Sequence, residues 1–167
     1  QNIRLYARMS VRDNVISGMH CHTKSGILSS IFNTRYKRLE EKQCEEESDE
    51  ILKLLDLYRF RFEMSTSLPY GAQRKLEIAR ALATHPKLLL LDEPAAGMNP
   101  NETEELMHTI HSVRDQFGVA ILLIEHDMNF VMGICEEITV LDYGRVIARG
   151  DGKAIRNNPK VIAAYLG

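Results

Sequence analysis

Two short, uninterrupted apolar runs constrain the fold of this chain more than any other feature. They cover residues 88–91 and 119–124. Continuous apolar runs of this length are typical of strands that are buried on both faces of a parallel sheet. Both are far shorter than the roughly 18 apolar residues that a membrane-spanning helix needs. The sequence therefore predicts two strands of a parallel sheet and no segment that crosses a bilayer.

A helix is expected between these two strands. Asn99 can cap its start, Pro100 suits its first turn, and Gly118 marks its end. Strand, helix and strand in this order predict a right-handed crossover between parallel strands, which is the unit of an α/β fold.

The segments on either side have their own patterns. Ser10 precedes Asp13 at capping-box-like spacing, and the charge-rich stretch 35–56 predicts a helix with a solvated face. Towards the other end, apolar runs flank Tyr143-Gly144, which predicts a hairpin turn. Residues 158–166 predict a short helix.

Composition excludes several classes of protein. The chain has 167 residues, of which 44% are hydrophobic, so it is long enough for one globular domain. It carries 21 Lys and Arg against 23 Asp and Glu, so it has no excess of positive charge that would favour binding to nucleic acid. Its three cysteines form no C-x-x-C pair, which predicts neither a disulfide framework nor a zinc site and fits a reducing compartment. Two groups of possible metal ligands, His20-Cys21-His22 and the pair His108 and His111, have no evident partner ligands elsewhere and are interpreted as incidental.

Polar residues that follow the two apolar strands are the first candidates for chemistry. Asp92 and Glu93 follow one strand, and His126 follows the other. Ligands of open parallel sheets bind outside the carboxyl ends of the strands. There, Asp92 would hold a hydrated Mg²⁺, Glu93 would orient or deprotonate a water, and His126 would sense a γ-phosphate. An isolated Asp-Glu pair, however, more often only marks a strand end that meets solvent.

A second candidate is the loop 68–74, which precedes a helix predicted over 75–82. A glycine-containing turn at a helix N-terminus offers free N–H groups and a positive dipole end to an anion. The alternative is an ordinary junction between a loop and a helix, in which Leu76, Ala79 and Leu82 only supply a core stripe.

Four motifs occur in a specific order along the chain. They are Gly-Ala-Gln-Arg at 71–74, Asp-Glu-Pro at 92–94, Ala-Gly-Met-Asn-Pro at 96–100 and Glu-His-Asp at 125–127. Together they resemble the ATP-binding cassette (ABC) ATPases. The resemblance implies a partial P-loop NTPase-like α/β domain with a parallel sheet core, in which residues 1–70 form a helical subdomain and 71–167 belong to the core.

The resemblance also assigns roles to residues. It implies a signature loop at 68–73, a Walker B strand at 88–93 and a D-loop at 95–100. The implied catalytic residues are Glu93, His126 and the Q-loop glutamine Gln1. The residues implied to bind ATP are Tyr70, Gly71, Ala72, Gln73 and Asn99. The implied Mg²⁺ ligands are Asp92 and Gln1.

Departures from the general pattern point to one branch of the family. In the signature loop, Pro69-Tyr70 replaces the usual Ser-Gly, which removes one hydroxyl contact to phosphate, and Ala72 stands where Gln is commonest. In the D-loop, Asn99 stands where Asp is usual. The Leu-Pro-Tyr-Gly signature, the segment 26–38 and the ending 155–167 resemble the ATPase subunits of branched-chain amino-acid importers. ATP and Mg²⁺ are the implied cofactors.

One expected motif is absent from the sequence. The phosphate-cradling pattern G-x-x-x-x-G-K-[ST] does not occur, and the chain does not begin with Met. In the family this pattern lies upstream of the Q-loop, so we expect that the natural start lies upstream and that this chain alone is inactive.

The resemblance implies partners as well. These are a second ABC ATPase subunit, two transmembrane permease subunits and, indirectly, an extracytoplasmic substrate-binding protein, at the cytoplasmic face of the plasma (inner) membrane and without nucleic acid. Two alternatives stay open: the ATPase of lipopolysaccharide export, which the Leu-Pro-Tyr-Gly signature disfavours, and a non-catalytic interaction fragment. The DNA-repair and translation relatives are disfavoured because the chain has no long coiled coil and no strongly basic linker.

Overall fold

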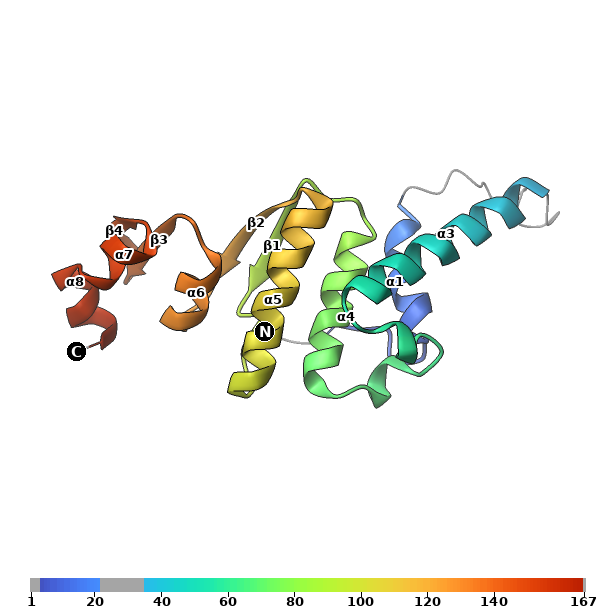
Figure 1. The fold of residues 1–167 in the computed structure, drawn as a ribbon, viewed down its shortest axis with the longest axis horizontal. Helices are drawn as coiled ribbons and strands as arrows, with labels where there is room; N and C mark the ends of the chain where they lie inside the picture. The colour runs from blue at the N-terminus through green and yellow to red at the C-terminus, as the bar shows by residue number, and fades with distance from the viewer. Residues whose placement is uncertain (1–3, 22–34, 167) are drawn as a thin grey trace.

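The computed structural model describes residues 4–21 and 35–166. Figure 1 shows their elements arranged as a row, in which α1, α3 and α4 form one end, β1, β2 and α5 the middle, and the elements after α6 the other end. Gln1 and the segment 22–34, which includes His22 and most of the stretch 26–38, lie outside the described residues.

The first end of the molecule is helical. Helix α1 (Val11–Met19) begins after Ser10, whose hydroxyl oxygen accepts a hydrogen bond from the Asp13 amide, so the predicted cap is confirmed. Helix α3 (Arg35–Leu54) confirms the predicted charged helix. Two 3₁₀ turns, η1 (Tyr58–Phe60) and η2 (Ser65–Ser67), lead to α4.

Helix α4 (Tyr70–Leu82) begins five residues before the start predicted at Lys75. Pro69 is the residue before it, with φ −54° and ψ 154°, and its carbonyl oxygen accepts the first helical hydrogen bond from the amide of Gln73 at 3.0 Å. Gly71 therefore lies inside the first turn and not in a preceding loop. The predicted core stripe of Leu76, Ala79 and Leu82 is confirmed, because all three are buried.

The middle of the molecule is the predicted strand, helix and strand. Strands β1 (Leu88–Asp92) and β2 (Ala120–Ile124) pair in parallel, and α5 (Pro100–Phe117) connects them. Asn99 and Glu102 form a reciprocal capping box at the start of α5. Gly118 ends the helix with a φ of 60°, a left-handed conformation that favours glycine.

The prediction that both strands are buried on two faces is wrong for the described residues. Leu89 and Leu91 belong to the same core as Leu106 and Ile110 of α5. The side chains that alternate with them are exposed. The exposed fraction is 66% for Leu90 and between 51% and 61% for Leu88, Leu122 and Ile124. The difference arises because side chains alternate between the two faces of a strand, and only one face of this sheet is covered by the described elements.

The remaining elements form the other end of the row. They are α6 (Met128–Ile134), β3 (Ile138–Asp142), β4 (Arg145–Gly150), α7 (Gly152–Arg156), α8 (Pro159–Val161) and the π-helical turn η3 (Ile162–Leu166). Tyr143 and Gly144 both have positive φ angles between β3 and β4, which confirms the predicted hairpin turn. Helix α7 was not predicted, because five residues are too few for a periodic pattern; Asp151 caps it by accepting from the Ala154 amide.

Two hydrophobic cores hold these elements. The larger core joins α1, α3, α4, α5 and β1 with Phe130 of α6, so it runs across the boundary that the sequence predicts between residues 70 and 71. The smaller core lies among α6, β3, β4, α7 and α8 and contains Val131, Ile138, Val140, Ala148, Ile155 and Val161.

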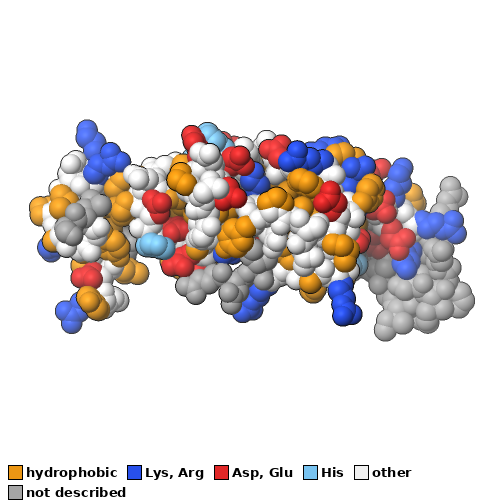
Figure 2. Space-filling model, turned by 90° about the horizontal axis from the view of Figure 1, so that it is seen from below, with side chains coloured by type: hydrophobic (Ala, Val, Ile, Leu, Met, Phe, Trp, Pro, Cys, Tyr) orange, Lys and Arg blue, Asp and Glu red, His pale blue; other side chains and the backbone are white. Residues whose placement is uncertain are grey.

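The surface mixes charges of both signs with hydrophobic side chains, as Figure 2 shows for one face. None of the described helices has the length and apolar content to cross a membrane.

The close approach of α1 and α4 generates the first prediction. An added Cβ at Gly18 would overlap the backbone carbonyl oxygen of Arg80, which cannot move alone. We expect Gly18→Ala to lower the free energy of unfolding by about 1–3 kcal/mol, measured by urea unfolding, although alanine favours a helix. The matched control is Gly133→Ala, whose Cβ would meet only the flexible Met107 sulfur at 2.8 Å; it should change stability by less than about 1 kcal/mol. Equal effects of the two variants would contradict the backbone overlap.

Candidate functional site

The carboxyl ends of β1 and β2 hold the first group of candidate residues. Asp92 is paired with Ile124 in the strand register, and the Glu93 amide donates to the Ile124 carbonyl oxygen at 2.9 Å. His126 follows two residues later, and its Nδ1 lies 3.4 Å from Oε1 of Glu93. Parallel pairing therefore brings Glu93 and His126 together at one edge of the sheet.

Glu93 has an unusual backbone. Its φ is 44°, in the left-handed region that non-glycine residues rarely adopt. A tight turn follows directly, in which the Ala96 amide donates to the Glu93 carbonyl oxygen at 3.2 Å. Such a conformation costs of order 1 kcal/mol or more and is common at functional sites.

Glu125 is a site residue that sequence reasoning did not single out. Its side chain is only 2% exposed, whereas that of His126 is 70% exposed. Its Oε1 accepts from the Ala95 amide at 3.1 Å, and its Oε2 accepts from the His126 amide at 3.0 Å and lies 3.6 Å from His126 Nδ1. The sequence places it first in the Glu-His-Asp motif that follows β2, and neither that motif nor its position reveals burial.

Asp92 ends β1 and is exposed. Among the residues that the structure describes, no hydrogen bond or ion pair engages its carboxylate. A free carboxylate beside a strand end is a suitable ligand for a divalent cation such as Mg²⁺.

The start of α4 holds the second group. No side chain among the described residues caps this helix end, so its first amides are available to an anion. Gln73 turns back and donates through Nε2 to the Leu68 carbonyl oxygen at 2.8 Å. Gly71 is buried close to the Glu102 carboxylate, and Ala72 is half-buried.

Tyr70 connects this helix end to the turn that follows Glu93. Its hydroxyl donates to the Ala96 carbonyl oxygen at 2.9 Å and accepts from Arg74 Nη2 at 3.0 Å. A tyrosine at this position thus bridges the predicted signature loop and the predicted D-loop.

The Asn99 side chain is engaged in the capping box. Its Oδ1 accepts from the Glu102 amide at 3.1 Å, while Glu102 Oε2 accepts from the Asn99 amide at 3.0 Å. The Asn99 side chain therefore caps the start of α5, and a contact with a ligand would be a second role.

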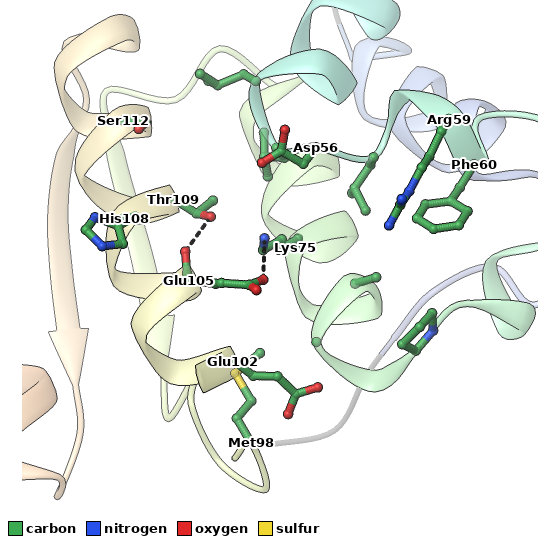
Figure 3. Close-up of a pocket in the computed structure, with 16 residues that line it drawn as sticks. Asp56, Arg59, Phe60, Lys75, Met98, Glu102, Glu105, His108, Thr109 and Ser112 are labelled. Carbon is green, nitrogen blue, oxygen red and sulfur yellow. Dashed lines mark hydrogen bonds and ion pairs between the residues drawn. The ribbon is translucent and has the colours of Figure 1, made fainter. Parts of the chain in front are cut away.

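A pocket of about 650 Å³ lies between α4, α5 and the segment 54–60 (Figure 3). Lys75 Nζ lies 3.4 Å from Glu105 Oε2 across it, and neither Glu93 nor His126 lines it. It touches the predicted signature loop through Pro69, Gly71 and Ala72. A second hollow of about 610 Å³ separates β2 from β3 and is lined partly by Cys135, whose pKa is raised by burial of the thiol.

Comparison with known proteins identifies the family. The family model described as ABC transporter matches residues 1–96, more than half of the chain, and the one described as branched-chain amino acid ATP-binding cassette transporter matches 145–167. The chain therefore belongs to the ABC transporter family.

Named relatives indicate which members of the ABC transporter family this chain is similar to. The high-affinity branched-chain amino acid transport ATP-binding proteins BraF of Pseudomonas aeruginosa and LivG of Escherichia coli are each 42% identical over all 167 residues. The chain spans 66% of the length of both. The lipopolysaccharide export system ATP-binding protein LptB of Haemophilus influenzae is more distant, at 28% identity over the whole chain and 63% of that protein.

Solved structures confirm the fold class. The ADP conformation of an ATP-binding cassette of an ABC transporter superposes with a TM-score of 0.77 at 29% identity, covering 96% of this chain and 64% of that one. The partial P-loop NTPase-like α/β fold predicted from the sequence is thereby confirmed.

The capping box supplies the second prediction. Replacing Asn99 by Ala removes the side-chain acceptor for the Glu102 amide, and we expect the free energy of unfolding to fall by about 1 kcal/mol. The matched control is Asn101→Ala, an exposed asparagine inside the first turn of α5, which should have little effect in the same urea titration. An unchanged midpoint for Asn99→Ala would rule out a stabilising cap.

Proposed function

We propose that this chain is part of an ATP-binding and ATP-hydrolysing subunit of an ABC importer for branched-chain amino acids. The observation that carries the proposal is the pair of Glu93 and His126 at 3.4 Å, at the carboxyl ends of two parallel strands of an ABC fold. The 42% identity to BraF and LivG, whose names specify branched-chain amino acid transport, supports this substrate class.

The residues present fit ATP with Mg²⁺. Asp92 offers an exposed carboxylate without a described partner, and the start of α4, which no described side chain caps, offers amides to a phosphate. Mg²⁺, when bound, supplies positive charge that stabilises the phosphates during transfer. Asp92 and, by resemblance, Gln1 would hold it.

Glu93 and His126 are the proposed catalytic side chains, with Gln1 as a third. The Glu93 carboxylate orients a water and takes its proton, because a carboxylate at a strand end that faces solvent can reach both water and phosphate. His126 contacts the γ-phosphate through Nε2, since Nδ1 faces carboxylates.

The signature loop acts on a nucleotide held by a second subunit. We assign the ATP contacts there to Tyr70, Gly71, Ala72 and Gln73, with Asn99 in the D-loop. Hydrolysis is then coupled to closure of two ATPase subunits against each other. Residues 1–70 form the helical subdomain in this proposal, and residues 71–167 belong to the core.

The proposed partners follow from transport. They are a second ATPase subunit, transmembrane permeases and, indirectly, an extracytoplasmic binding protein, with the ATPase on the cytoplasmic face of the plasma membrane. A bacterial ABC transporter cassette that is dimeric shares this fold, with a TM-score of 0.70 at 22% identity.

Lipopolysaccharide export is the less favoured substrate class. LptB is 28% identical to this chain, against 42% for BraF and LivG. Tyr70, in the Leu-Pro-Tyr-Gly signature, argues in the same direction.

The role of Glu93 generates the third prediction. In the full-length subunit, Glu93→Gln should retain ATP binding, because size and polarity are kept, and should lower steady-state phosphate release by at least about 100-fold, since the base is lost. Glu104→Gln, at an exposed acid of α5, is the matched control and should keep the parent rate. Phosphate release by Glu93→Gln at the parent rate would remove Glu93 from the mechanism.

The missing phosphate-cradling pattern generates the fourth prediction. We expect calorimetric titration of Mg-ATP into this 167-residue chain to show no tight binding, and a phosphate-release assay to show no turnover. The full-length subunit is the positive control. Tight, Mg²⁺-dependent binding by the 167-residue chain would contradict the expectation that it is inactive alone and would favour an unrecognised phosphate site.

A further inference from the structure

Glu125 is the most deeply buried carboxylate near the proposed catalytic pair, and the mechanism above does not use it. Its side chain is 2% exposed, compared with 28% for Glu93. A buried carboxylate is costly unless hydrogen bonds compensate for lost water. Here the Ala95 amide donates to Oε1 of Glu125, and the His126 amide donates to Oε2.

Glu125 and Glu93 both face the same ring nitrogen of His126. Nδ1 of His126 lies 3.6 Å from Oε2 of Glu125 and 3.4 Å from Oε1 of Glu93. A ring nitrogen that faces two carboxylates is favoured as the N–H, because a lone pair there would be repelled. Distances of this size are within ion-pair range and commonly shorten when a ligand binds.

The same carboxylate also holds the turn after Glu93. Its hydrogen bond to the Ala95 amide fixes the turn from the side of β2, and the Tyr70 hydroxyl fixes the adjacent Ala96 carbonyl from the side of α4. The turn is therefore held from two elements that are distant in sequence.

We propose that Glu125 is a positioning residue: it faces the Nδ1–H of His126 and so directs Nε2–H, as the donor, towards the γ-phosphate, and it anchors the turn that follows Glu93. This role rests on the proposed function of Glu93 and His126. Glu125 acts through those two residues and does not itself touch the nucleotide.

The test uses Glu125→Gln, which keeps the size and an acceptor for the Ala95 amide but removes the charge beside Nδ1. The first readout is the ¹⁵N chemical shift of both His126 ring nitrogens at alkaline pH, in the full-length subunit with ¹⁵N-labelled histidine, assigned with a His126→Gln variant. At alkaline pH the ring keeps one of its two protons. We expect the parent ring to keep the one on Nδ1, and Glu125→Gln to shift population towards the form protonated on Nε2.

Tyr70→Phe is the matched control for the turn. It releases the Ala96 carbonyl from the tyrosine hydroxyl without touching the imidazole, so the ring-nitrogen shifts should stay at the parent values. If Glu125→Gln leaves these shifts unchanged, or if Tyr70→Phe changes them equally, the proposal is overturned.

The second readout is ATP hydrolysis by the full-length subunit. Glu125→Gln should lower kcat by about tenfold at an unchanged KM for ATP, because a charge-assisted contact to His126 is lost and the nucleotide contacts remain. An unchanged kcat beside altered ring shifts would also overturn the positioning role. A parent subunit without ATPase activity would instead contradict the proposed function, while the ring-nitrogen measurement would still decide whether Glu125 orients His126.

Discussion

The parallel pairing of β1 with β2 is the constraint on which the rest of the candidate site depends. The register places Asp92 beside Ile124, and the hydrogen bond from the Glu93 amide to the Ile124 carbonyl oxygen continues the pairing past the strand end. Because of that bond, His126 lies beside Glu93, and Glu125 reaches the Ala95 amide in the turn that follows Glu93. A slip of one residue would turn every side chain to the opposite face and separate Glu93 from His126.

The packing of α4 and α5 connects this edge to the rest of the molecule. Both helices share the larger core with β1, so the start of α4 and the turn before α5 are held on one rigid base. The hydrogen bond from Tyr70 to the Ala96 carbonyl oxygen then spans the short remaining distance. In a member of the ABC transporter family, this contact links the loop proposed to meet the partner's nucleotide with the turn that follows the proposed catalytic carboxylate.

Local signals in the sequence predicted much of the fold. Ser10 and Asn99 were found as helix caps because capping is a contact between residues three positions apart, and Tyr143-Gly144 was found as a turn because its backbone conformation is local. The start of α4 was placed too late, since Gly71 suggested a loop although it lies within the first turn. The exposure of Leu90 and Ile124 was missed, because an apolar run does not reveal how many faces of its sheet are covered.

The order and spacing of the motifs determined the family by themselves, and they determined that Asp92, Glu93 and His126 follow two apolar strands. Such motifs can be recognised from residue types and their order along the chain. Only the tertiary structure decided that Glu125 is buried beneath His126 and that Tyr70 reaches Ala96. The contacts of Tyr70 with Ala96 and of Glu125 with Ala95 join residues 26 and 30 positions apart, and burial depends on every element that packs around a side chain. No local pattern carries that information.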